Sequence, residues 1–132
     1  MSPRQIQLVR ETFPTIQEMA KPMTHLFYGR LFQIEPGLRA MFHGPVEVQS
    51  NKFAAMLGTL VEGLADMERQ RPALRAMGLR HCGYGVIPQH YPIVAQALLL
   101  AISHTLEAEA TPEVFAAWSA MLGDVASMML QD

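Results

Sequence analysis

The sequence is poor in cysteine and in charge of either sign. Its 132 residues include a single cysteine, Cys82, which excludes an intrachain disulfide framework and is typical of a reducing compartment. Ten Lys and Arg residues stand against twelve Asp and Glu residues, and the basic residues form no run, which argues against a nucleic-acid-binding surface. Only 17% of the residues are charged and half are hydrophobic, so the chain can bury a sizeable core.

The sequence also lacks an apolar stretch long enough to cross a bilayer. The longest such stretch, residues 94–102, is interrupted by Gln96 and closed by His104. The N-terminus has no apolar signal region. We therefore expect no membrane partner, and a soluble cytoplasmic protein with one domain over residues 1–132.

Helical signals follow one another along the whole chain, without a strand pattern. Ser2 before Pro3, with Gln5 three residues after Ser2, is typical of a helix N-terminus with a capping box, and Thr111 before Pro112 is a second such start. The loop His43-Gly44-Pro45 separates two helical regions. The predicted helices cover residues 3–19, about 22–34, 36 to about 42, about 46–67, from the Arg71-Pro72 boundary to 81, 88 to about 107, and 112 onwards. Six to seven helices predict an all-α fold.

Within the second helix, apolar side chains recur at helical spacing. Leu26, Phe27, Leu31 and Phe32 are predicted to form its buried stripe.

One of the five histidines has an unusual setting. His81 lies near the end of an apolar helical segment, where the carbonyl of Met77, one turn earlier, is within reach of one ring nitrogen. Gly83 and Gly85 follow and let the chain turn closely. The other four histidines are predicted to be surface or capping residues: His25, His43, His90 and His104.

Several segments resemble one protein family. The segment LRHCGYGV from Leu79, followed by HYPIV from His90, resembles the proximal region of bacterial haemoglobins and flavohaemoglobins, which are globins. Trp118 continues the match in the last helix, HLFYGRLF from His25 resembles the family's second helix, and RAMF from Arg39 contains a phenylalanine found in nearly all globins. The resemblance covers most of the chain.

The resemblance implies a globin fold packed around a haem pocket. His81 would be the proximal iron ligand, Tyr91 would pack beside it, and Phe42 would stack on the haem. No Cys-x-x-Cys-His motif is present, so the expected cofactor is haem b held without a covalent bond. An acidic residue that completes the family's proximal cluster falls beyond Asp132, so we expect that cluster to lack its carboxylate.

The resemblance also implies residues for the distal side, where a diatomic ligand binds. Tyr28 would point into the pocket, and either Gln49 or Ser50 would lie over the iron. We choose Gln49, because Phe53 then falls one turn later as an apolar distal wall. Tyr28 and Gln49 would each donate a hydrogen bond to the bound ligand, worth on the order of 1.5–3 kcal/mol.

The remaining pocket residues are assigned in the same way. Lys52, Arg80 and His90 are candidates to meet the haem propionates. Cys82 is expected to be buried as a small apolar residue. The predicted lining of the pocket consists of Phe53, Leu57, Met77, Val86, Val94, Leu122 and Val125.

These expectations define a primary function and two alternatives. The primary one is a single-domain haemoglobin that binds O2, NO and CO and removes NO by dioxygenation. The sequence has no Gly-x-Gly-x-x-Gly motif, so electrons would come from a separate reductase. The alternatives are a haem sensor or interaction module with a globin fold, and an O2 carrier or store without catalysis.

Overall fold

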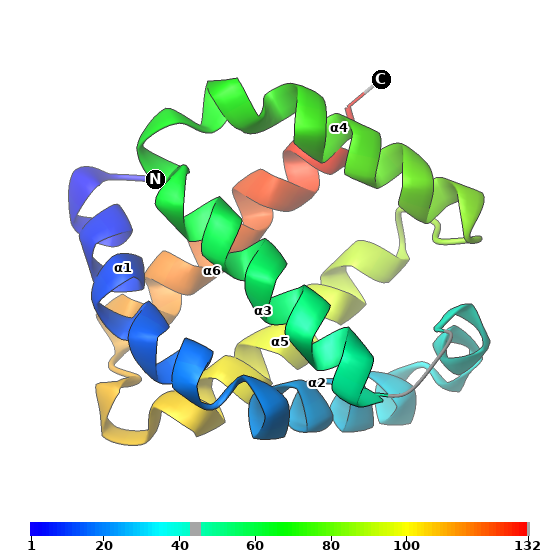
Figure 1. The fold of residues 1–132 in the computed structure, drawn as a ribbon, viewed down its shortest axis with the longest axis horizontal. Coiled ribbons are helices and arrows are strands. Elements are labelled where there is room, and N and C mark those ends of the chain that lie inside the picture. Colours follow the sequence, from blue (N-terminus) through cyan, green and yellow to red (C-terminus); the bar gives the residue numbers. More distant parts are fainter. Residues whose placement is uncertain (43–45, 132) are drawn as a thin grey trace.

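The structure, a computed structural model, describes residues 1–42 and 46–131, so the predicted loop at residues 43–45 lies outside the described residues. Six α-helices make up most of the described chain (Figure 1). They are α1 (Pro3–Glu18), α2 (Ala20–Ile34), α3 (Val46–Glu62), α4 (Met67–Gly83), α5 (His90–Leu106) and α6 (Pro112–Met129). Three short 3-10 helices join them: η1 (Pro36–Met41), η2 (Leu64–Asp66) and η3 (Glu107–Glu109). No residue of the described part is in a strand, which confirms the all-α prediction.

Side-chain caps begin the helices where the sequence predicts them. The Oγ of Ser2 accepts a hydrogen bond from the backbone N–H of Gln5 at 3.1 Å, and the Oε1 of Gln5 accepts one from the backbone N–H of Ser2 at 3.0 Å. This is the expected capping box of α1. Thr111 caps α6 by accepting from the backbone N–H of Val114 at 3.2 Å.

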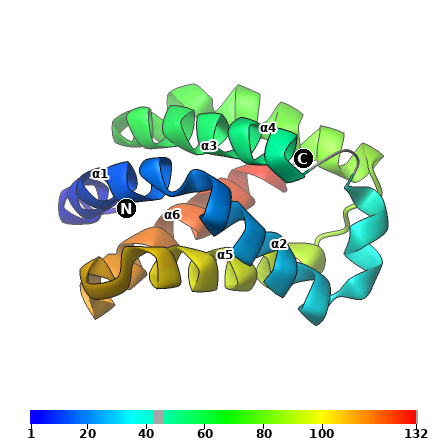
Figure 2. The ribbon, with the colours of Figure 1, turned by 60° about the horizontal axis from the view of Figure 1, so that its bottom comes forward.

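The helices cross one another in two connected groups. Helix α2 packs on α3 and α5, whereas α1 and α4 both pack on α6. Figure 2 shows α3 and α4 on one side of the molecule and α5 on the other, with α6 rising between them towards α4. Helices α3 and α4 diverge from the η2 corner, so the start of α3 and the end of α4 lie at the open end of a V (Figure 1).

A buried polar contact ties the first helix to the last. Trp118 of α6 is fully buried, and its indole Nε1–H donates to the hydroxyl of Thr12 on α1 at 2.9 Å. The Thr12 hydroxyl in turn donates to the carbonyl of Leu8 at 2.8 Å. Val9 and Met121 are also fully buried in this core. The indole therefore keeps a partner for its N–H in a region that excludes water.

Helices α4 and α6 approach each other very closely at Gly78. A Cβ atom placed on Gly78 would collide with the backbone carbonyl of Met129. Gly78 is itself buried. The close crossing thus requires a residue without a side chain at this position.

Three predicted helix boundaries are wrong. Pro72 lies inside α4, although Arg71-Pro72 was expected to mark a boundary. The helix continues because Leu74 and Gly78, which follow the proline, are buried and α4 packs on α6. Pro88 lies in the turn before α5, which begins at His90 instead. The third long helix also ends earlier than expected, at Glu62, and η2 then separates it from α4.

One residue of the predicted buried stripe of α2 is exposed. The Leu26 side chain is 41% exposed, whereas Phe27 and Leu31 are buried as expected and Phe32 is partly buried. The buried face of α2 is made instead by Met23, Thr24, Phe27, Tyr28 and Leu31. Among the residues that the structure describes, no helix is both long and apolar enough to cross a membrane.

Candidate functional site

His81 is held by a hydrogen bond in the last turn of α4. Its Nδ1 lies 2.7 Å from the carbonyl oxygen of Met77. A carbonyl can only accept, so Nδ1 carries the hydrogen, and in a neutral imidazole Nε2 then keeps its lone pair. Within the described chain, no group hydrogen-bonds to Nε2. The predicted contact with Met77 is confirmed, and it leaves one nitrogen of a partly buried imidazole ready to bind a metal.

A tight turn follows His81. The backbone N–H of Val86 donates to the carbonyl of His81 at 3.0 Å, closing the end of α4. Gly85 has a φ of 96°, a conformation that is costly for a residue with a side chain. The turn leads into α5, where the partly buried Tyr91 and Val94 lie in the first turns.

Aromatic rings from three elements gather around Tyr28. The ring of Tyr28 lies 5.0 Å from that of Phe42 at the end of η1, in an edge-on arrangement. Phe32 stacks on Tyr28 at 5.8 Å. On the other side, Phe27 lies 5.0 Å from Tyr28 and stacks on Phe53 of α3 at 5.4 Å. The structure thus brings the predicted residues Tyr28, Phe42 and Phe53 into one cluster.

The phenol of Tyr28 is an unused hydrogen-bond donor. Tyr28 is buried, and its hydroxyl makes no hydrogen bond to any described residue. Burial raises the pKa of Tyr28 above its usual value, because the charged phenolate would be poorly solvated. The side chain is therefore a neutral phenol at physiological pH, able to donate to a ligand.

The distal residue chosen from the sequence stays a prediction. Gln49 and Ser50 are the fourth and fifth residues of α3, with Gln49 partly buried and Ser50 only 2% exposed. The hydroxyl of Ser50 has no hydrogen-bond partner among the described atoms. A buried hydroxyl without a partner is unfavourable, so this part of α3 contains a polar atom that no described group satisfies.

The predicted pocket walls are apolar side chains, most of which are only partly buried. Phe42 is 38% exposed, whereas Leu57 and Val125 are buried in the core. The others are partly buried: Phe53, Met77, Val86, Val94 and Leu122. These residues come from α3, α4, α5, α6 and the turn before α5. Their joint role as a pocket lining stays a prediction.

Cys82 does not behave as expected. Its thiol is exposed, so the expected burial is wrong. The inward face of α4 consists of Leu74, Met77, Gly78 and His81. Cys82 is the next residue after His81, so it is rotated by about 100° around the helix, away from this face. Tyr91 is near this thiol: burial raises the pKa of Tyr91, and the charge of Cys82 raises it further. The predicted packing of Tyr91 beside His81 stays a prediction.

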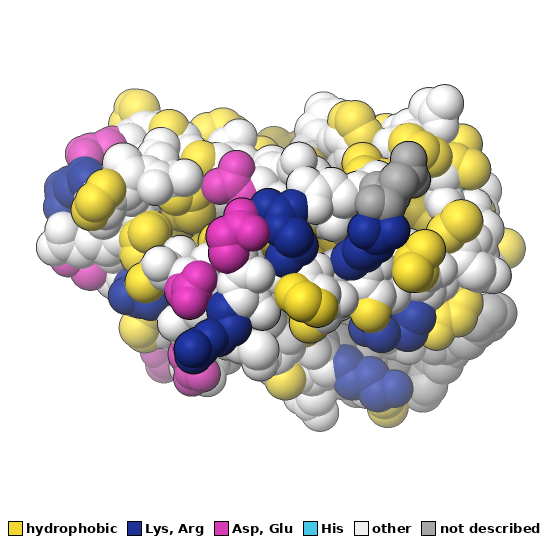
Figure 3. Space-filling model, turned by 90° about the horizontal axis from the view of Figure 1, so that it is seen from above, with side chains coloured by type: hydrophobic (Ala, Val, Ile, Leu, Met, Phe, Trp, Pro, Cys, Tyr) yellow, Lys and Arg dark blue, Asp and Glu magenta, His cyan; other side chains and the backbone are white. Residues whose placement is uncertain are grey.

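The candidates for propionate contacts differ in their surroundings. Lys52 and Arg80 are exposed, and His90 accepts a hydrogen bond at Nδ1 from the backbone N–H of Ile87 at 3.2 Å. Figure 3, which views the molecule from above, shows Lys and Arg side chains among apolar and acidic ones on the face seen there. The propionate role of these three residues stays a prediction.

The residues of this region fit a haem. Iron in a ligand-binding haem protein needs one oriented imidazole, and His81 has the required anchored Nδ1. The flat ring needs apolar walls, and partly exposed apolar side chains are present on several elements. The opposite side needs donors to a bound ligand, and Tyr28 offers an unpaired phenol. No group of three or more potential metal-ligating side chains occurs within residues 1–42 and 46–131.

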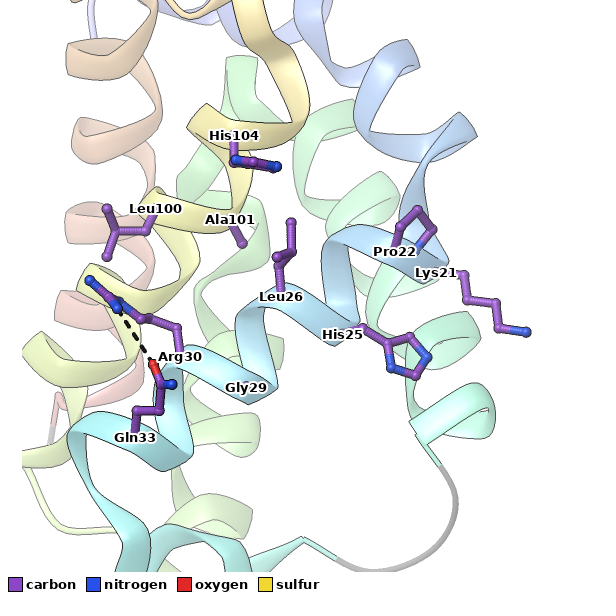
Figure 4. A pocket seen from close by; sticks show the side chains of 10 residues that line it. All are labelled: Lys21, Pro22, His25, Leu26, Gly29, Arg30, Gln33, Leu100, Ala101 and His104. Atoms are coloured by element: carbon purple, nitrogen blue, oxygen red, sulfur yellow. Dashed lines mark hydrogen bonds between the residues drawn. The ribbon is translucent and has the colours of Figure 1, made fainter.

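The structure also contains a hollow that the sequence interpretation missed. It lies between α2 and α5, has a volume of about 1020 Å³, and is lined in part by Lys21, His25, Arg30 and His104 (Figure 4). A signal was present in the sequence. Lys21, His25, Gly29 and Gln33 recur every four residues along α2, which places them on one face of the helix.

Comparisons with known proteins agree on the fold and the family. The family model "Globin" matches residues 25–129. A bacterial globin from Campylobacter jejuni is 24% identical, with a TM-score of 0.84 over 98% of this chain and 94% of that one, which shows the same fold. An engineered carbene transferase, made from a Rhodothermus marinus protein assigned as a nitric oxide dioxygenase, is 29% identical with a TM-score of 0.85. That match covers 98% of this chain and 90% of the other.

Curated relatives are longer proteins. A flavohemoprotein of Deinococcus radiodurans is 34% identical over 98% of this chain and 33% of its own length. One of Bacillus subtilis is 29% identical over 95% of this chain and 32% of its own length. The chain thus spans about a third of the length of these relatives. Because the family model covers most of the chain, and the fold matches that of a solved bacterial globin, the chain belongs to the globin family.

Proposed function

We propose that this globin binds haem b without a covalent bond and uses it to convert NO to nitrate with O2. The observation that carries the proposal is the hydrogen bond from Nδ1 of His81 to the carbonyl of Met77, which leaves Nε2 as a metal ligand. Haem iron, when bound, supplies an open coordination position for a diatomic molecule. The names of the flavohemoprotein and nitric oxide dioxygenase relatives support the choice of NO as a substrate.

The protein's own residues would divide the work between two sides. On the proximal side, Met77 fixes the ring of His81 in one orientation and one tautomer. On the distal side, the neutral phenol of Tyr28 donates a hydrogen bond, with Gln49 as a second donor. Phe42 and Phe53, which belong to the aromatic cluster around Tyr28, exclude water from that side.

The proposed reaction needs an electron from outside the described residues. O2, NO and one electron together give one nitrate ion, so each turnover consumes one electron. The sequence contains no Gly-x-Gly-x-x-Gly motif that would bind a dinucleotide donor. We therefore assign electron delivery to a reductase that lies outside residues 1–132.

Visible spectroscopy of the purified protein supplied with haem tests the proposal. We expect stoichiometric uptake of haem and distinct reduced, O2 and CO spectra. The variant His81→Ala should lose the normal CO spectrum, because the proximal ligand is gone. His104→Ala is a matched control, since His104 is an exposed histidine of α5 and should leave every spectrum unchanged. No haem uptake, or spectra indifferent to His81→Ala, would overturn the proposal.

A further inference from the structure

The hollow between α2 and α5 is separate from the haem site. Successive residues of an α-helix are rotated by about 100°, so Lys21, His25, Gly29 and Gln33 lie on the side of α2 opposite to its buried face. Tyr28 belongs to the buried face. The hollow is open to solvent on one side, and its volume of about 1020 Å³ is at the upper end of typical ligand pockets, about 300–1,000 Å³.

The edge of the hollow carries two permanent positive charges, on Lys21 and Arg30. Lys21, His25 and Arg30 from α2 and His104 from α5 line it, and its lining contains no Asp or Glu. None of the four basic residues forms an ion pair with any described side chain. The whole chain has a net charge of −2, so this local excess of positive charge is not a property of the overall composition.

Arg30 is the best placed of these cations to hold an anion. One of its terminal nitrogens, Nη1, donates a long hydrogen bond to the Oε1 of Gln33 at 3.4 Å, and both side chains line the hollow (Figure 4). The remaining N–H groups of Arg30 have no partner among the described residues. A guanidinium with free donors is matched in geometry to the two oxygens of a carboxylate.

The floor of the hollow is apolar. Leu26 and Leu100 are each 41% exposed and lie there together with Ala101 (Figure 4). Covering an exposed leucine with an apolar group is favourable, because it removes apolar surface from water. An apolar floor bordered by Lys21 and Arg30 is complementary to a molecule with a hydrocarbon chain and an anionic head.

We propose that this hollow binds a single-chain amphiphilic carboxylate. Its head would pair with Arg30, and its chain would lie on Leu26 and Leu100. The positive charge of Arg30 calls for a negatively charged head group. The exposed side chains of Leu26 and Leu100 call for a hydrocarbon chain that covers them. We favour a small amphiphile over an acidic helix of a partner protein. A docked helix lays a row of anchoring side chains, at positions i, i+3, i+4 and i+7, into a long hydrophobic groove, whereas the apolar lining here is limited to Pro22, Leu26, Leu100 and Ala101.

Calorimetric titration of the haem-loaded protein tests the proposal with three probes. Decanoate carries both features, acetate carries the head alone, and decyltrimethylammonium carries a similar chain with the opposite charge. We expect decanoate to bind with one molecule per chain and the other two probes to bind at least about tenfold more weakly. Arg30→Gln should weaken decanoate binding by about tenfold or more, because charge-assisted hydrogen bonds are lost.

Two further variants make the test specific to the hollow. Leu26→Asp places a negative charge on the floor and should abolish decanoate binding, whereas the exposed position of Leu26 lets the variant fold. Arg75→Gln on α4 is the control, since Arg75 is also exposed and forms no ion pair with a described residue. Equal binding of all three probes would overturn the proposal. Decanoate binding that is unchanged in both Arg30→Gln and Leu26→Asp would also overturn the proposal. An acidic helical peptide that binds in an Arg30-dependent way where decanoate fails would assign the hollow to a protein partner instead.

Discussion

The hydroxyl of Thr12 serves two hydrogen bonds inside the core. It accepts from the indole N–H of Trp118 and donates to the carbonyl of Leu8. Water does not reach the bond between Thr12 and Trp118, because Trp118 is fully buried and Thr12 is only 5% exposed. A donor left without a partner in such a place costs more than the net gain of a normal hydrogen bond.

The substitution Thr12→Val should therefore lower the free energy of unfolding by about 1–3 kcal/mol. Valine keeps the shape of threonine but cannot accept from the Trp118 indole. Urea denaturation followed by Trp fluorescence measures the change. The control is Thr59→Val, because the exposed hydroxyl of Thr59 bonds only to the carbonyl of Ala55 in its own helix. Equal effects of the two substitutions would show that the buried contact contributes nothing special.

The buried phenol of Tyr28 predicts a loss of stability in alkali. Its pKa is raised in the folded protein, whereas an unfolded chain releases the phenolic proton near the ordinary value of 10.0. Below that pH both states keep the proton, so stability does not depend on this group. As pH rises through that value, the unfolded state loses its proton first and is favoured, so the free energy of unfolding falls.

Tyr28→Phe should flatten this alkaline decline, which is measured by urea unfolding between about pH 9 and pH 11. Tyr84→Phe is the matched control, because Tyr84 is 63% exposed and should leave the slope unchanged. Identical slopes in the wild type and Tyr28→Phe would contradict the prediction. A shallow decline should persist in Tyr28→Phe, because the pKa of Tyr91 is also raised.

The same substitution tests the proposed distal role of Tyr28. If its phenol donates to the diatomic ligand, Tyr28→Phe should raise the rate of O2 dissociation by about ten- to 150-fold, the equivalent of one charge-assisted hydrogen bond. Stopped-flow displacement of O2 by CO measures this rate. Slow O2 release in the wild type favours NO dioxygenation over O2 delivery. An unchanged rate in Tyr28→Phe would remove the phenol from the proposed mechanism.

Residues were predictable from the sequence where a local rule placed them. The contact of His81 with the Met77 carbonyl follows from the four-residue repeat of a helix, and it is confirmed. The exposure of Cys82 was not predictable, because it depends on where the packing of α4 against other helices stops. The hydrogen-bond partner of Trp118 could not be predicted either, because Thr12 is distant from it along the chain.

At the scale of elements, the crossing of α4 and α6 depends on Gly78. An alanine there would place its Cβ against the Met129 carbonyl, and neither backbone can yield without moving its helix. Gly78→Ala should lower the free energy of unfolding by about 1–3 kcal/mol or more, as overpacked cores do. Gly123→Ala on α6 should instead raise it by about 0.5–1 kcal/mol, because a Cβ at Gly123 meets nothing within 4 Å.

Thermal or urea unfolding of the two alanine variants measures both effects. A stabilised Gly78→Ala variant would mean that the helices are further apart than described. This pair also shows why helix formation and helix packing are separate problems. The intrinsic helix propensity favours alanine over glycine at both positions. At Gly78, contact with the neighbouring helix makes glycine the better residue.

Helix existence was more predictable than helix boundaries. The caps at Ser2 and Thr111 act between neighbours in sequence, and both are confirmed. Pro72 was expected to end a helix, yet α4 runs through it because the residues beyond the proline pack on α6. Leu26 was expected inside because it is apolar, but its direction around α2 places it in the solvent-open hollow beside α5.

At the scale of the whole molecule, the proposed haem should act as a structural ligand. A ligand that binds only the folded state adds about 2.7 kcal/mol at a hundredfold excess over its dissociation constant. For a chain of this size, removal of haem should lower the melting temperature by about 10 °C. Calorimetry of the haem-loaded and haem-free protein measures the difference.

Hydrogen exchange should locate that stabilisation. We expect the added protection to concentrate in the first turns of α3 and the last turns of α4, where Ser50 and His81 lie at the open end of the V (Figure 1). The contact between α1 and α6 should change little. Protection spread evenly over all helices, or confined to α1 and α6, would contradict the assignment of the site.

The packing of α1 on α6 has a consequence for how the protein is made. The principal partner of α1 is the last helix of the described chain, so its buried face with Val9 and Ile16 has no complete cover until α6 has been synthesised. At about 5–20 residues per second, α1 leaves the ribosome roughly 5–20 s before α6 does. During that interval the nascent chain presents an amphipathic helix that chaperones can bind, and the fold closes only when Trp118 reaches Thr12.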